Sequence, residues 1–206
     1  LRIKKVEMDK VFEDHIISFI SENKQNKFNK VLEDRTRHLT VVLEDIYQPH
    51  NASAVLRSCD CFGVQDIHII ENRNKYNVNP QIAVGSAKWL NLNYHNEKKE
   101  NTVACINELK AKGYKIVATT PHQDDVMLPD LPLDQPIALL FGTELEGLTD
   151  VALEHADEFM RIPMYGFTES YNISVSAALC FYELSNKLHN SKLNWKLTDD
   201  EILDLH

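Results

Sequence analysis

The chain has 206 residues, of which 43% are hydrophobic and 26% are charged, and its formal net charge is −9. This length and apolar content are enough to bury the core of one domain that carries appendages. The acidic balance disfavours a generic nucleic-acid binder, because such proteins neutralise phosphates with lysine and arginine.

We expect neither a targeting segment nor a metal site. No segment holds the roughly 18 consecutive apolar residues of a membrane span, and Leu1–Lys5 lacks the apolar run of a secretion signal, so we expect a soluble, cytoplasmic protein. The four cysteines have no C-x-x-C spacing, and the nine histidines form no H-x-x-x-H pattern. We therefore expect buried, reduced thiols and no metal.

Residues 1–38 read as a helical N-terminal extension, with apolar positions of helical spacing across 6–34. Residues 1–40 hold nine Lys and Arg against seven Asp and Glu, so this end is locally basic. A candidate RNA-docking strip consists of Lys24, Lys27, Lys30, Arg35 and Arg37. A solvated helix face explains the same lysine spacing equally well.

Short apolar runs then alternate with helical segments. The expected strands are 39–43, 67–70, 114–119, 137–141 and 159–162, and the expected helices are 51–62, 79–87, 102–112, 149–156 and 173–189. This alternation predicts a domain over 39–190 of the α/β class, a mostly parallel sheet flanked by helices. Residues 191–206 form an expected helical tail, opened by the capping-box pattern Thr198-Asp199-Asp200-Glu201.

Polar residues follow three of these strands, where open parallel sheets bind ligands. In Asn51–Arg57, we expect Asn51 to be an N-cap and Arg57 to lie off the inward stripe of Ala52, Val55, Leu56 and Cys59. A simple cap and a surface arginine would also explain that stretch. In Phe141–Leu148, Gly142 permits close backbone approach and Glu144 offers an acceptor, although Glu144 also suits a cap for the next helix.

The third polar segment runs from Ile162 to Ala178 and contains Ser170 and Asn172, which either orient a hydroxyl or cap the following helix. In this order the three segments resemble the signature motifs of the SpoU (TrmH) family of RNA ribose 2'-O-methyltransferases, over residues 36–190. Phe167, Glu169 and Tyr171 stand where TrmH-like members usually have Met, Gln and Leu. The resemblance implies a Rossmann-like SPOUT fold with a C-terminal trefoil knot, which periodicity does not indicate.

The resemblance also implies a chemistry and its residues. The methyl donor would be S-adenosyl-L-methionine, the acceptor a ribose 2'-hydroxyl, and the target guanosine 18 in the D-loop of tRNA. The implied catalytic residues are Arg57, Asn51, Glu144, Ser170 and Asn172. The backbone groups expected to hold the cofactor lie near Thr119, Gly142, Ile162 and Tyr171.

Arg57 is expected to position a phosphate and act electrostatically, because an arginine pKa above about 12 makes it a poor base. A homodimer is expected, with close helix contact at the small residues Ser176, Ala177 and Ala178, and with Arg57 completing the partner's site. Two alternatives stay open: methylation of ribosomal RNA, and a non-catalytic RNA- or nucleotide-binding module. The intact polar residues of the three motifs count against the second.

Overall fold

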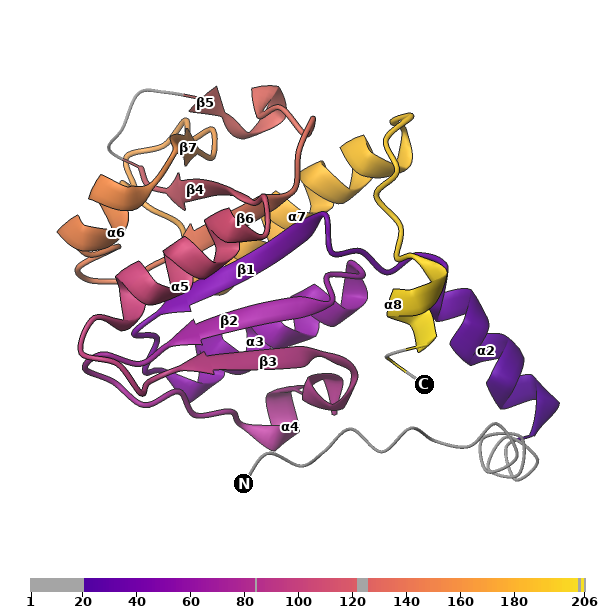
Figure 1. The fold of residues 1–206 in the computed structure, drawn as a ribbon. Helices are drawn as coiled ribbons and strands as arrows, with labels where there is room; N and C mark the ends of the chain where they lie inside the picture. Colours follow the sequence, from indigo (N-terminus) through magenta and orange to yellow (C-terminus); the bar gives the residue numbers. More distant parts are fainter. Residues whose placement is uncertain (1–20, 84, 122–125, 204, 206) are drawn as a thin grey trace. The chain divides into compact units, whose positions relative to one another are not determined.

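A computed structural model describes residues 21–203 and 205, with gaps at 84 and 122–125 (Figure 1). The helix expected across 6–20 lies outside the described residues. The described residues fall into two compact units, one within 35–196 and the other formed by 21–34 together with 197–203 and 205. Each unit is described by itself.

The larger unit is built on a seven-stranded sheet in the order β3-β2-β1-β6-β4-β7-β5, and all of its strand pairs are parallel. The strands are β1 (Leu39–Glu44), β2 (Asp66–Ile70), β3 (Asn91–His95), β4 (Lys115–Thr119), β5 (Val126–Met127), β6 (Ile137–Phe141) and β7 (Glu158–Arg161). Every residue of β1 and β6 is buried, as both-face coverage requires. The predicted α/β class is confirmed.

Helices cover the two faces of this sheet (Figure 1). Val41 and Leu43 of β1 belong to the core shared with α3 (Pro49–Cys61) and α7 (Ile173–His189). Val42 points to the opposite core, which includes α5 (Asn101–Ala111) and α6 (Asp150–His155). The inward stripe predicted for α3 is confirmed, because Ala52, Val55, Leu56 and Cys59 are fully buried.

The helix expected over 79–87 is broken into α4 (Pro80–Ala83) and a 3-10 turn, η1 (Ser86–Trp89). Gly85 separates them in the left-handed region, with φ 81°, a conformation that favours glycine. A second 3-10 turn, η2 (Leu128–Asp130), lies in the proline-rich stretch that precedes β6.

The position of β7 bears on the expected knot. β4 and β5 follow one another in the chain, yet β7 lies between them, pairing Ala118 with Phe159 and Met127 with Arg161. Thus β7, which follows β6 in the chain, lies in the sheet between β4 and β5, which both precede β6. The threading of the following segment through a loop stays a prediction.

The smaller unit contains α2 (Glu22–Leu32) and α8 (Asp199–Leu203). The capping box at α8 is confirmed: the Thr198 amide donates to Glu201 Oε2 over 2.8 Å, and the Glu201 amide donates to Thr198 Oγ1 over 3.3 Å. None of the described helices is both long enough and apolar enough to cross a membrane.

The ends of the larger unit lie outside the expected 39–190 range. The Thr36 amide donates to the Gly63 carbonyl over 2.8 Å, and the Thr36 hydroxyl donates to the Trp195 carbonyl. These bonds show that the segment before β1 and the segment after α7 belong to the larger unit. The domain boundaries at 38 and 190, and the RNA contacts of the extension, stay predictions.

Candidate active site

A cavity of about 370 Å³ lies at the carboxyl ends of β4, β6 and β7. This is the edge at which open parallel sheets bind ligands. Its wall includes all four residues expected near a cofactor: Thr119, Gly142, Ile162 and Tyr171. Glu144 and Ser170, two of the five expected catalytic residues, also line it.

The loop after β6 closes tightly on itself and forms one wall of the cavity. The Thr143 and Gly147 amides each donate to the other's carbonyl over 3.0 Å, and Gly147 has φ 72°. A Cβ placed on Gly142 would lie 2.1 Å from the Gly147 carbonyl carbon and oxygen. Position 142 therefore requires glycine because the backbone of Gly147 approaches it closely, and this requirement holds whether or not a ligand also approaches.

The side-chain amide of Asn172 joins all three sequence motifs. Its Nδ2 donates to Asn51 Oδ1 over 3.1 Å and also to Glu144 Oε1. Its Oδ1 accepts from the Ser174 amide over 2.9 Å, so Asn172 is also the N-cap of α7. The interpretation of Asn172 as a cap is confirmed, and the same side chain contacts two other expected site residues; its role in catalysis stays a prediction.

The expectation that Asn51 is an N-cap is wrong. Gln48 precedes the helix and Pro49 takes its first position, which suits proline because that position needs no amide donor. Asn51 is buried in the first turn, and its Nδ2 donates to Gln48 Oε1 over 2.6 Å. Its side chain is therefore held so that its oxygen faces Asn172.

Arg57 lies outside the cavity wall of its own chain. It is exposed on α3, six residues after Asn51 and away from the buried stripe. Within the described residues its guanidinium has no hydrogen bond or ion pair. The structure thus brings together four of the five expected catalytic residues and leaves the arginine apart from them.

A family model described as the SpoU rRNA methylase family matches residues 38–182, which contain this whole arrangement. The chain belongs to this family. A tRNA (guanosine(18)-2'-O)-methyltransferase of Borreliella burgdorferi is 44% identical over 183 residues, 89% of this chain and 82% of the relative. The protein of the same name in Thermus thermophilus is 34% identical over 163 residues, 79% of this chain and 82% of the relative.

Solved structures agree with the family assignment. The A. aeolicus TrmH/SpoU tRNA modifying enzyme superposes with a TM-score of 0.78 at 30% identity, covering 89% of this chain and 93% of that one. The predicted membership of the SpoU family is confirmed.

Sequence reasoning missed a buried carboxylate that supports the cavity of this SpoU protein. Glu44 ends β1 and accepts from the Thr149 amide over 2.9 Å and from the Thr149 hydroxyl over 2.9 Å. It also accepts from the Thr102 hydroxyl over 2.6 Å. Glu44 thereby fixes the start of α6, whose N-cap is Thr149 and not Glu144. Two consecutive acidic residues, Glu44 and Asp45, at the end of an apolar strand are the sequence feature that could have indicated this carboxylate.

Asp45 and Arg73 connect the loop that follows β2 with the loop that follows β6. Asp45 Oδ1 accepts from the amides of Asn72 and Arg73 over 2.8 Å each. Arg73 Nη2 lies 2.7 Å from Glu146 Oε2, and this hydrogen bond is the main cause of a raised Arg73 pKa. Arg73 lies outside the three sequence motifs, so the sequence did not indicate its contact with the loop that follows β6.

The expected RNA-docking strip is only partly exposed. Lys24, Lys27 and Lys30 are exposed on α2. Arg35 is only 3% exposed and forms an ion pair with Asp60 of α3, which corrects its assignment to the strip. Arg37 is half-buried, and its Nε donates to Asp66 Oδ2 over 3.0 Å.

Two further expectations need correction. Cys61 is exposed, whereas Cys59, Cys105 and Cys180 are buried, and all four thiols are free. On α7, Ala177 is fully buried and faces the core, so it cannot form a surface contact. The exposed apolar side chains of this helix are Val175, Leu179 and Tyr182.

Proposed function

We propose that this SpoU family member transfers a methyl group from S-adenosyl-L-methionine to the ribose 2'-hydroxyl of guanosine 18 in tRNA. The observation that carries the proposal is the Asn172 amide, which connects Asn51 and Glu144 at the cavity. The names of the relatives from B. burgdorferi and T. thermophilus support this substrate.

The residues around the cavity fit this cofactor. A volume of about 370 Å³ lies within the usual range for small-ligand sites. Leu148 and Met160 offer apolar contacts for an adenine, whereas Glu144 and Glu169 suit a ligand with sulfonium and ammonium charges. When bound, the cofactor supplies an electrophilic methyl group, and the chain's residues then have to align the acceptor oxygen with it.

The polar residues at the cavity have separate tasks in this proposal. Asn172 holds the Glu144 carboxylate in place, and Ser170 is exposed on the wall with a hydroxyl that can bond the acceptor ribose. Asn51 keeps α3 attached to this group through its bond with Asn172. Transfer then depends on alignment and on a path for the hydroxyl proton.

Arg57 is proposed to act from a second copy of the chain. Its guanidinium is exposed and does not line the cavity of its own chain. The apolar side chains of Val175, Leu179 and Tyr182 give α7 a surface that a second copy would cover. In the resulting homodimer each Arg57 would bind a phosphate of the RNA held at the partner's site and stabilise the developing oxyanion.

The experiment is incorporation of tritiated methyl from S-adenosylmethionine into unmodified tRNA transcripts, followed by nuclease mapping of the labelled ribose. We expect label at guanosine 18 and none in a transcript that carries 2'-deoxyguanosine at that position. The family description names ribosomal RNA, so ribosomal transcripts belong in the same assay. Label in ribosomal RNA alone would replace the proposed substrate, and cofactor binding without label in any RNA would favour a binding module.

A further inference from the structure

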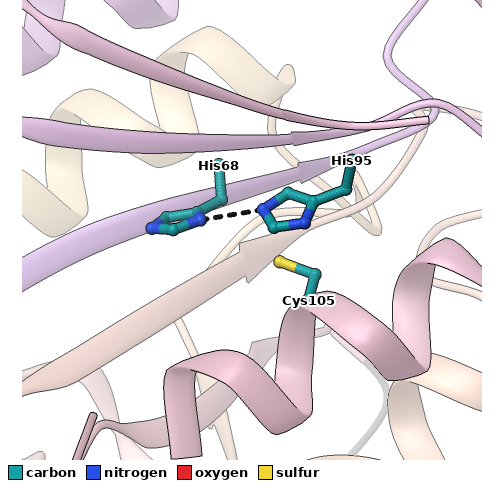
Figure 2. A group of neighbouring side chains, drawn as sticks. All are labelled: His68, His95 and Cys105. Carbon is teal, nitrogen blue, oxygen red and sulfur yellow. Dashed lines mark hydrogen bonds between the residues drawn. The ribbon is translucent and has the colours of Figure 1, made fainter. Parts of the chain in front are cut away.

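Three potential metal ligands from three different elements meet beside the edge strand β3 (Figure 2). His68 is in β2, His95 ends β3, and Cys105 is in α5. His68 Nδ1 and His95 Nε2 lie 3.0 Å apart, and one ring nitrogen of each histidine and the Cys105 sulfur all lie within 4.8 Å of one another. In Figure 2 the sulfur points toward the two imidazoles.

From this geometry we propose a zinc site formed by His68, His95 and Cys105. Imidazole nitrogen and thiolate sulfur are the preferred ligands of Zn²⁺. Two nitrogen ligands about 2.0 Å from a tetrahedral zinc ion lie about 3.3 Å apart, close to the separation already present. Small side-chain rotations would bring the three donors to the metal without moving the elements that carry them.

A fourth ligand comes from solvent. His95 is half-exposed, so water reaches the group, whereas His68 and Cys105 are buried. Glu108 and Lys112 are the nearby charged side chains that act on both imidazoles, and they pair with each other over 2.7 Å. Their charges largely cancel, so the pair presents little net repulsion to a cation.

The proton balance of binding is simple. One of the two facing nitrogens, His68 Nδ1 or His95 Nε2, carries the hydrogen of the bond between the rings. On zinc binding this proton moves through solvent to the other nitrogen of the same ring. Both facing nitrogens then have a free lone pair for the metal. The Cys105 thiol releases its proton to solvent and binds as thiolate. One proton leaves for each Zn²⁺ bound, and no electron is transferred.

The site would act on stability and not on methyl transfer. In the sheet, β2 and β1 separate β3 from β6, whose carboxyl end carries the cavity. A zinc ion held by β2, β3 and α5 would fasten the edge strand to both its neighbour in the sheet and the helix packed on it. The sequence predicted no metal because the three donors are 27 and 10 residues apart along the chain, spacings that match no local ligand pattern.

The test uses the full chain, stripped with EDTA and then titrated with zinc chloride or, as a spectroscopic probe, cobalt chloride. We expect one zinc per chain, a zinc-dependent rise in melting temperature, and a thiolate-to-cobalt charge-transfer band with the intense visible bands of tetrahedral Co²⁺. His95→Gln should weaken zinc binding by about 100-fold or more, since loss of mere supporting residues already costs 10–100-fold. Cys105→Ala should abolish the charge-transfer band.

Cys61→Ala is the matched control, because Cys61 is the exposed thiol most open to adventitious metal. It should keep the stoichiometry, the band and the melting shift. His95 is half-exposed, so its variant is expected to fold, which a zinc-free melting curve matching that of stripped wild type would confirm. The proposal is overturned if stripped wild type binds no zinc at micromolar concentration, if the band persists in Cys105→Ala, or if it disappears in Cys61→Ala.

Discussion

Asn172 donates a hydrogen bond to Asn51 Oδ1 over 3.1 Å, joining residues that are 121 positions apart in the chain. The same amide reaches Glu144, so the first, second and third motifs share one side chain. The carbonyl side of Asn172 meanwhile caps α7. Capping and bridging use opposite ends of one side chain, and substitution can separate them.

Asn172→Asp should keep the cap and lose the bridge. An aspartate oxygen still accepts from the Ser174 amide and keeps the cap, so the free energy of unfolding should fall only by the cost of leaving the Asn51 oxygen without its donor, about 1–3 kcal/mol. The variant places a carboxylate beside Glu144 and removes both donors, so methyl transfer should fall at least about tenfold, or about 1.4 kcal/mol. Single-turnover methylation and urea denaturation measure the two effects.

Asn190→Asp is the control for this substitution, because Asn190 ends the same helix and, among the residues that the structure describes, its Nδ2 donates only to the Asn186 carbonyl. It should leave methyl transfer at the wild-type rate. Equal losses of activity in the two variants would show that the bridge has no special part in the site.

Gly142→Ala should damage the cavity wall. The added Cβ meets the Gly147 backbone at 2.1 Å, so the loop must open, at a cost of about 1–3 kcal/mol for overpacking. The affinity for the cofactor, measured by calorimetry, should fall because the loop forms one wall of the cavity.

Gly113→Ala is the control, since Gly113 has φ +86° but its Cβ would touch nothing within 4 Å. It should lose about 1 kcal/mol of stability and keep its cofactor affinity; retention of affinity by Gly142→Ala would contradict the role given to this loop.

Cys180 should make the protein sensitive to alkali. Burial raises the pKa of this thiol from 9.0 to about 12. The unfolded chain releases the proton above pH 9.0 while the folded chain keeps it, so this contribution to stability is complete below pH 9.0 and is lost as the pH rises toward 12. Within that window it removes about 1.4 kcal/mol per pH unit.

The measurement is urea denaturation of wild type and Cys180→Ala at several pH values between about 8 and 11. The variant should be less stable at the lower pH because of its cavity, yet its stability should fall less steeply with pH, by about 1.4 kcal/mol per unit. Cys61→Ala removes an exposed thiol and is the control for the loss of a cysteine. Parallel curves for wild type and Cys180→Ala would refute the prediction.

The lysines of α2 provide a test of the RNA-docking strip. Replacing Lys24, Lys27 and Lys30 with alanine should lower the slope of log affinity for tRNA against log salt by about 0.7 to 0.9 for each phosphate that the protein no longer neutralises. Lys98 and Lys99 are also exposed and serve as a control pair. If the α2 variant and the control bind tRNA with the wild-type slope, α2 presents only a solvated face.

The sequence predicted those parts of the fold in which local pattern and burial agree. The run Ile137–Phe141 became β6 with the bounds expected, because all five residues are apolar and buried. β3 was missed because Asn91 and Asn93 interrupt its apolar pattern, which an edge strand tolerates. Asn51 was assigned to a cap because the sequence does not show that Gln48 and Pro49 begin the helix.

Long-range contacts limited the prediction of the site in the same way. The residue types at Asn51, Glu144 and Asn172 indicated a ligand site, but only the fold shows that one amide connects them. Arg35 looked like an available cation until its ion pair with Asp60, 25 positions away, placed it in the interior. Charge and spacing describe a residue's neighbours along the chain, and these contacts come from elsewhere in it.

Mixing two inactive variants tests whether Arg57 acts across a homodimer. If Arg57 completes the partner's site, Arg57→Ala and Asn172→Asp chains each inactivate a different half of every composite site. Mixing them should form heterodimers in which one site carries both substitutions and the other carries neither. With equal amounts and random exchange, about half of the dimers are mixed, so activity should recover to about a quarter of the wild-type value. Mass-tagged chains establish that exchange is complete, and the unmixed variants give the baseline. Complete exchange with no recovery would mean that each site is built within one chain, and that Arg57 has no part in its partner's chemistry.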